Sequence, residues 1–207
     1  MDERKIILAQ MQRLFRFQSL SKNVSSVNSN LYADDRTIGV KSEIIRFNSY
    51  IESINSIIEK GEYSIEFIDG SMVNFWYEFD KAGKCVMHSI SYMPYYKDVN
   101  DEEAEDANID EYFFCERVSQ YLRIDYEEQG RKEFCHSLIH LHMGPGRDSL
   151  RIPVDSVIYP NDFMFFVLNY IYGEGIEDKY FEKRAEEDII RDFLTEAEKE
   201  RARISFV

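Results

Sequence analysis

Three of the four histidines in this 207-residue chain lie close together, in the stretch CHSLIHLHMGPGRDSLRIPVD that begins at Cys135. His136, His140 and His142 are separated by even numbers of residues, so on a β-strand all three would project from one face. Imidazoles gathered in this way can exchange protons near neutral pH or bind a transition metal. The stretch therefore predicts a functional site, although its pattern matches no known catalytic signature.

A glycine-rich turn and two arginines follow these histidines directly. Gly144 and Gly146 flank Pro145, and glycines in such a turn can adopt positive φ and expose backbone N–H groups. Arg147 and Arg151 come next. Backbone amides and guanidinium groups both bind phosphate, so this region is expected to hold an anion.

A strand from Gln120 to Glu127 is expected to pair with the histidine strand as a hairpin across residues 128–131. If the turn has an even number of residues, residues of opposite parity pair, and Tyr121, Arg123 and Asp125 share the face of the histidines. The cluster would then combine a phenol, a cation, a carboxylate and several imidazoles. These are the groups needed for general acid–base catalysis or for positioning a phosphate.

Three interpretations of this cluster stay open. His140 and His142 could bind zinc, but no carboxylate or cysteine lies at a customary ligand spacing, so neither a metal nor another cofactor is predicted. In a metal-free enzyme the two imidazoles would donate and accept a proton while arginines stabilise a phosphate, as metal-independent ribonucleases require. In the structural interpretation the histidines form hydrogen bonds within a polar sheet face, and Arg151 pairs with Asp155 or Asp125.

Charge and composition limit the classes of partner. With 39 acidic and 25 basic side chains the formal net charge is −14, which disfavours broad attraction to nucleic acid or anionic lipid. A contact with RNA or a nucleotide phosphate must therefore be local. The three cysteines form no CxxC pair, and the sequence has neither a signal peptide nor an apolar run of spanning length. A cytoplasmic protein without membrane contact is expected.

The hydropathy pattern predicts an α+β fold in a single domain, with an antiparallel meander of five or six strands packed by helices. Period-two alternation covers residues 62–70, 71–79 and 85–93, with the hairpin described above and a short edge strand RIPV after it. His88 falls in line with Val86 and Ile90, so we expect a hydrogen-bonded core histidine.

Helical periodicity and capping residues predict helices before, within and after this meander. The expected helices cover residues 3–17, 42–60, 160–172 and 182–203, and a polar Ser/Asn-rich loop covers 19–30. In the second of these, the stripe expected in the core is Ile44, Phe47, Ile51, Ile54 and Ile58. The domain then divides into an N-terminal helix and polar arm (1–40), a core (41–173) and a charged C-terminal helix (174–207).

An acidic segment from Asp98 to Glu111 holds eight carboxylates. It lacks the glycine and glutamate positions of a calcium-binding EF-hand loop. We expect a solvated loop that leads into a short helix near residues 112–119. The alternative is docking onto a basic partner.

The run HLHMGPGRDSLRIPV, with YPNDFMFFVLNYIY after it, resembles the C-terminal segment of a bacterial family catalogued as a domain of unknown function. The residues that carry the resemblance are His140, His142, Gly144, Pro145, Gly146, Arg151 and Pro153. The resemblance implies a bacterial cytoplasmic protein without assigned activity, from the mobile-gene or phage-defence repertoire. The histidine strand is also similar, more distantly, to that of small toxins in toxin–antitoxin pairs.

Two functions follow as expectations. The first is a small metal-independent nuclease or phosphodiesterase-like enzyme that uses His140 and His142, aided by Arg147 and Arg151. The second is a non-catalytic subunit or inhibitor in a bacterial defence complex. Its acidic loop and final helix would bind a protein partner, and self-association into a homo-oligomer is a further expectation.

Overall fold

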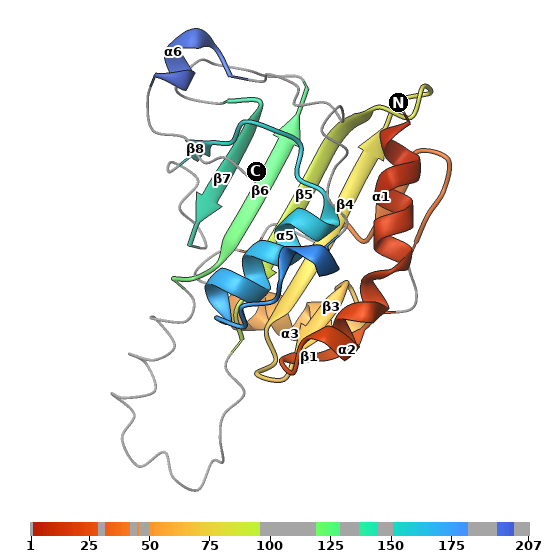
Figure 1. Ribbon diagram of the computed structural model, residues 1–207, viewed down its shortest axis with the longest axis vertical. Coiled ribbons are helices and arrows are strands. Elements are labelled where there is room, and N and C mark those ends of the chain that lie inside the picture. The colour runs from red at the N-terminus through yellow and green to blue at the C-terminus, as the bar shows by residue number, and fades with distance from the viewer. Residues whose placement is uncertain are drawn as a thin grey trace, which may run out of the picture.

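The computed structural model describes residues 2–28, 32–41, 45, 50–95, 119–128, 137–144, 151–181 and 194–200. Eight strands in these residues form one antiparallel sheet, in the order β1-β3-β4-β5-β6-β7-β8, with β2 paired to β4 (Figure 1). The strands are β1 (Val24–Val27), β2 (Thr37–Gly39), β3 (Ile65–Phe67), β4 (Met72–Phe79), β5 (Cys85–Met93), β6 (Leu122–Glu127), β7 (Ile139–Met143) and β8 (Arg151–Pro153). The α+β class is confirmed, with eight strands instead of the expected five or six.

The additional strands come from the first forty residues. The prediction of a loop at residues 19–30 was wrong, because β1 pairs with β3 and buries Val24. The hydroxyl of Ser26 donates to the Glu66 carboxylate at 3.0 Å. Serine side chains here therefore bond across the sheet instead of competing for their own backbone. β2 pairs with the second half of β4, where Ile38 is fully buried.

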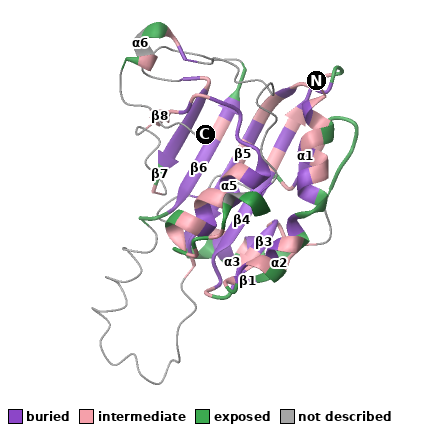
Figure 2. Ribbon diagram, in the orientation of Figure 1, coloured by how far each residue is buried: buried purple, intermediate pink, exposed green. Residues whose placement is uncertain are grey.

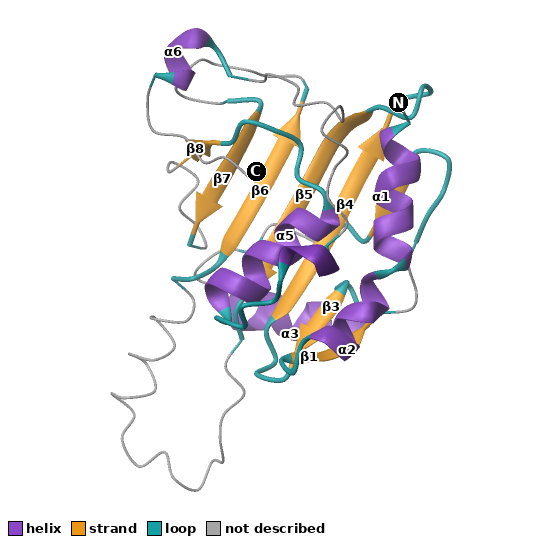
Figure 3. Ribbon diagram, in the orientation of Figure 1, coloured by secondary structure: helices purple, strands orange, loops and turns teal. Residues whose placement is uncertain are grey.

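Helices cover both faces of the sheet. The described α-helices are α1 (Glu3–Gln12), α2 (Phe17–Leu20), α3 (Tyr50–Lys60), α5 (Pro160–Phe166) and α6 (Glu196–Lys199). In the view of Figures 1 and 3, α1 and α5 lie in front of the sheet and α3 lies behind it. The predicted first helix is shorter than expected, since a 3-10 turn, η1 (Leu14–Arg16), replaces its last residues.

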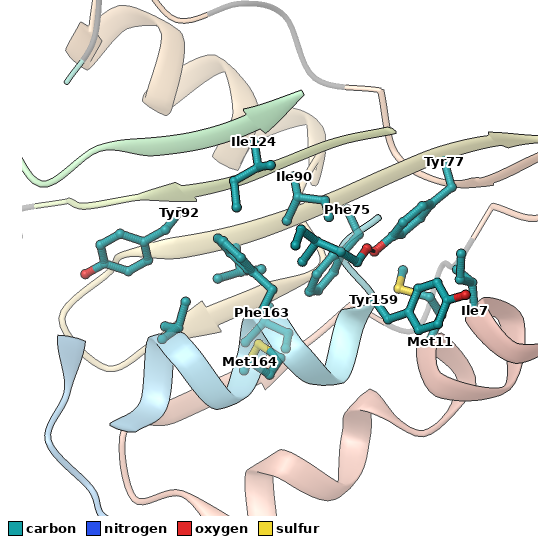
Figure 4. Close-up of a cluster of buried hydrophobic side chains, with 14 of the residues drawn as sticks. Ile7, Met11, Phe75, Tyr77, Ile90, Tyr92, Ile124, Tyr159, Phe163 and Met164 are labelled. Carbon is teal, nitrogen blue, oxygen red and sulfur yellow. Dashed lines mark hydrogen bonds between the residues drawn. The ribbon is translucent and has the colours of Figure 1, made fainter. Parts of the chain in front are cut away.

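The main core lies between the sheet and the helices α1 and α5. Figure 4 shows side chains of α1 and α5, such as Ile7, Met11 and Phe163, packed against those of β4 to β6. The predicted alternation in β4 is confirmed, since Phe75 and Tyr77 face this core. The buried strands appear as the purple centre of the molecule in Figure 2.

His88 lies in this core, as predicted. It is 0% exposed, and its ring centroid lies 5.8 Å from that of Tyr77 and 5.6 Å from that of Tyr126. The backbone N–H of Ile158 donates to its Nε2 atom at 3.4 Å. Burial disfavours the imidazolium form and lowers the pKa of His88 from 6.5 to about 4.

The helix α3 packs on the opposite face of the sheet, and of the described residues in the expected stripe only Ile54 is buried. Tyr50, Ile54 and Ile57 are buried there, whereas Ile51 and Ile58 are 39% and 38% exposed. Isoleucines lie on two adjacent faces of this helix. The buried face is the one that carries Tyr50, whose hydroxyl donates to the Pro94 carbonyl. Ile45 is not helical, and residues 42–44 and 46–49 lie outside the described residues.

The predicted helix at 160–172 is confirmed in extent but changes geometry within its length. The α-helical turns of α5 continue into a π-helix, η3 (Val167–Ile171), and Gly173 follows with a left-handed φ of 64°. Of the predicted C-terminal helix the structure describes residues 194–200, where α6 is helical but Leu194 and Thr195 are not, so the prediction of one continuous helix was wrong there. The acidic segment 98–111 and the helix expected near 112–119 lie outside the described residues, except for Ser119.

Candidate functional site

The strands β5 to β8 place a band of polar side chains on the face opposite α1 and α5. Residues alternate between faces along a strand, so those that flank the buried Ile90, Ile124 and Leu141 point to the other side. Cross-strand pairing aligns them in two rows. The rows are Ser89, Asp125, His140 and Pro153, and Ser91, Arg123, His142 and Arg151.

The pairing register confirms that Arg123 and Asp125 share a face with His140 and His142. Arg123 pairs with His142, and Asp125 pairs with His140. The two strands thus have the opposite parity that an even turn requires. We call Ser89, Arg123, Asp125, His140, His142 and Arg151 the polar site.

Asp125 is the centre of the polar site. Its Oδ1 atom accepts a hydrogen bond from the Ser89 hydroxyl at 2.8 Å, and its Oδ2 atom accepts one from Arg123 Nε at 2.8 Å. The same Oδ2 atom lies 3.4 Å from His142 Nε2. The carboxylate therefore links a hydroxyl, a guanidinium and an imidazole from three strands.

These contacts keep Asp125 ionised. Burial opposes its charge, but interactions with His142, Arg123 and Ser89 outweigh burial and hold the pKa of Asp125 well below its ordinary value. Burial also opposes the charge of Arg123. Its interactions with Asp125 and Tyr121 outweigh that effect and raise the pKa of Arg123. At neutral pH the site thus contains a formed ion pair.

The two histidines are buried side by side. Both are 3% exposed, and their ring centroids lie 4.7 Å apart with the rings nearly perpendicular. His140 Nδ1 lies 3.0 Å from the Ser137 carbonyl oxygen. Because a carbonyl only accepts, this nitrogen carries the proton, and Nε2 of a neutral His140 is an acceptor. His142 Nδ1 is buried and has no hydrogen-bond partner among the described residues.

Comparison with known proteins places the chain in a family. The model of DUF2290, an uncharacterised conserved protein family, matches residues 12–206. The chain belongs to the DUF2290 family. No curated protein and no solved structure gives a significant match. The membership of an uncharacterised family that was predicted from the sequence is confirmed.

In this DUF2290 chain, Gly144 has a role other than the expected one. Gly144 has the predicted positive φ, 72°, but its N–H donates to the Tyr121 carbonyl at 2.8 Å. This amide extends the β6–β7 ladder and is not available to an anion. Tyr121 packs edge to face against Tyr50 below α3, and its phenol also interacts with Arg123, so it borders both the apolar cluster there and the polar site.

Of the four remaining predicted residues, one lies among the described residues and three lie outside them. Arg151 lies on the edge strand β8, directly opposite His142, and is half-buried. The edge position predicted for RIPV is confirmed. His136, Gly146 and Arg147 lie outside the described residues.

Sequence reasoning missed Ser89 and Ser137. Ser89 alternates with His88 and Ile90, so the period of β5 could have placed it on the polar face. No sequence signal identifies the Ser137 carbonyl as the partner of His140. This contact depends on the backbone conformation just before β7.

The opposite face of the same strands has different chemistry. A cavity of about 450 Å³ lies between β6, β7 and the helix α5, lined mainly by apolar side chains such as Leu122, Leu141 and Phe166. Proton-transferring groups therefore gather on the polar site and not in this cavity. None of the helices in the described parts of this DUF2290 chain is long and apolar enough to cross a membrane.

Proposed function

We propose that the polar site cleaves phosphate esters without requiring a metal ion, with His140 and His142 as the groups that transfer protons. The observation that carries the proposal is the contact of Asp125 with His142 at 3.4 Å, beside a second buried imidazole whose ring centroid is 4.7 Å away. Two oriented imidazoles can serve as general base and general acid in one displacement at phosphorus.

The hydrogen bonds give each histidine a role. When His142 accepts a proton from the attacking oxygen, the Asp125 carboxylate balances the charge that forms. His142 Nδ1, which has no partner among the described residues, is the atom that would accept this proton. His140 is held through Nδ1 by Ser137, so its Nε2 atom would deliver a proton to the leaving oxygen. Asp125 and Ser89 are positioning residues in this scheme.

The local charge favours an anionic substrate. Arg123 and Arg151 contribute two positive charges and Asp125 one negative charge, so the polar site carries a formal +1 within a chain of −14. Arginine binds phosphate oxygens in a bidentate manner and stabilises charge that develops at phosphorus. Arg151 is on the edge strand beside His142, where it would contact a phosphate held between the imidazoles.

Burial favours a small substrate. The side chain of Asp125 is 27% exposed, whereas that of His142 is 4% exposed. A ligand would therefore reach the imidazoles past Asp125, which suits a low-molecular-mass phosphodiester better than a duplex. The chain's negative charge also repels long polyanions.

The test is a hydrolysis assay with tag-free protein and a panel of bis(p-nitrophenyl) phosphate, cyclic nucleotides, dinucleotides and single-stranded RNA. We expect turnover of at least one small diester, and a loss of about 10²–10⁴ in rate for His142→Gln or His140→Gln. The matched control is Tyr170→Phe, at a residue that is 72% exposed on the opposite side of the sheet. Equal rates in all four proteins would refute the proposal, as would a lack of turnover across the whole panel.

The alternative function from the sequence stays a prediction. Residues 101–111 lie outside the described residues, and the helical part of the described residues 194–200 is α6. The cytoplasmic location and the phage-defence or toxin role likewise stay predictions.

A further inference from the structure

We propose that Asp125, His140 and His142 form a binding site for a divalent transition-metal ion, with Zn²⁺ as the first candidate, and that the bound ion blocks the polar site. Each of the three residues offers one ligand atom, and the three atoms all lie within 4.8 Å of one another. The binding site stands on geometry alone. The blocking effect rests on the proposed function.

The spacing of two ligand atoms matches a single tetrahedral ion. His142 Nε2 and Asp125 Oδ2 lie 3.4 Å apart. Ligands bound to zinc at about 2.0–2.2 Å with a tetrahedral angle lie about 3.3–3.6 Å apart. An ion can therefore replace the proton shared by these two atoms with little movement of either side chain.

The third ligand is already oriented. His140 donates from Nδ1 to the Ser137 carbonyl, so in the neutral ring Nε2 carries the lone pair and is the nitrogen that would bind an ion. Metal-binding histidines commonly donate their other N–H to a backbone carbonyl or carboxylate, which fixes the ring and its tautomer. Asp125 is supported in the same way, because Ser89 holds its Oδ1 atom. Two of the three ligands thus have the second contact of a metal site, whereas His142 Nδ1 has none among the described residues.

The ligand set selects the kind of ion. Two imidazoles and one carboxylate suit Zn²⁺, Co²⁺ or Fe²⁺, whereas Mg²⁺ and Ca²⁺ prefer oxygen ligands alone. Three protein ligands leave a fourth position open. Arg123 shares the Asp125 Oδ2 atom and adds a positive charge, so it competes with the ion for the carboxylate. We therefore expect micromolar affinity, weaker than that of a structural zinc site.

A bound ion has a direct consequence for the proposed reaction. The lone pair of His140 Nε2 that would carry the proton becomes a ligand, and Asp125 can no longer balance charge on His142. The ion would thus inhibit the metal-free cleavage and not support it. Zinc would then act as a reversible regulator of the polar site.

The experiment is a titration of tag-free, metal-free protein with Co²⁺, followed by the visible absorption bands of cobalt with four or five ligands. We expect saturation at one ion per chain and displacement by Zn²⁺. The absence of these bands in folded wild-type protein at millimolar cobalt would overturn the metal site without recourse to any variant.

Variants test the identity of the ligands. Asp125→Asn and His140→Ala should weaken cobalt binding about a hundredfold, whereas His88→Gln, which removes a core histidine, should leave it within about twofold. Equal cobalt affinity in wild type and all three variants would overturn the assignment of these ligands. Circular dichroism of each variant confirms that it is folded.

The activity assay separates this inference from the proposed function. If the protein cleaves a phosphate ester, Zn²⁺ should inhibit it with a midpoint near the Kd measured by cobalt competition. Activation by Zn²⁺ would overturn the blocking effect. A protein that binds cobalt and cleaves nothing would keep the metal site and refute the proposed function alone.

Discussion

Acidification is expected to destabilise the fold by about 3 kcal/mol through His88 alone. Burial lowers the pKa of this imidazole from 6.5 in an unfolded chain to about 4 in the folded one, a difference of about 2.5 pH units. Each unit corresponds to about 1.4 kcal/mol, so the full effect is about 3.5 kcal/mol, of which about 3 kcal/mol is lost by pH 4. This is a large part of the roughly 5–15 kcal/mol that stabilises a typical domain.

The sign of the effect follows from proton binding. Above pH 6.5 His88 is neutral in both states and pH has no effect through it. Between pH 6.5 and about 4 the unfolded chain binds a proton that the folded chain does not, so the free energy of unfolding falls. Below about pH 4 both states bind the proton and the loss levels off. Asp125, with its lowered pKa, contributes to acid sensitivity only below its ordinary value of 3.8.

Urea denaturation of wild type and His88→Gln at a series of pH values measures this effect. Glutamine keeps an acceptor for the Ile158 N–H but does not titrate. The difference between the two proteins in free energy of unfolding should therefore shrink by about 3 kcal/mol between pH 7 and pH 4. The other ionisable groups are common to both proteins, so their contributions cancel. A constant difference across this range would refute the buried, neutral state of His88.

Three further changes test the fold and the polar site by chemical denaturation. Arg123→Met should cost about 2–3 kcal/mol, because it leaves the Asp125 carboxylate without its guanidinium partner, and a variant as stable as wild type would contradict that ion pair. Phe163→Ala should cost about 3–5 kcal/mol at a residue that is 0% exposed, against at most about 0.5 kcal/mol for Tyr170→Ala; equal costs would contradict the packing of α5. Gly144→Ala should cost about 1–2 kcal/mol, since alanine is strained at a φ of 72°, and no cost would mean that this turn is relaxed.

The sequence was sufficient for the central strands and for most of the polar site. Alternating apolar residues identified β4 and β5, and the parity of a hairpin placed Arg123 and Asp125 on the face of His140 and His142. Both inferences need only the period of two that any half-buried strand imposes. They hold because the pairing register here contains no bulge between β6 and β7.

The remaining features depend on contacts that no local pattern encodes. The strand β1 lies in a Ser-rich segment, and it is recognisable only once Glu66 on β3 is beside it. The predicted buried face of α3 is shifted by one residue from the observed one, because isoleucines occupy two adjacent stripes of the helix. Parity placed Asp125 on the face of the two histidines but did not give the distances between their ligand atoms, which depend on side-chain conformation.

The central claim is that the buried His140 and His142, positioned by Asp125, perform proton transfer on a phosphate ester. The most direct test is kcat/KM for a small phosphodiester in the presence of a chelator, measured for wild type and His142→Gln. The account predicts turnover that survives chelation and falls about 10²–10⁴-fold in the variant. Undiminished turnover by His142→Gln, or activity that chelation abolishes in wild type, would contradict it.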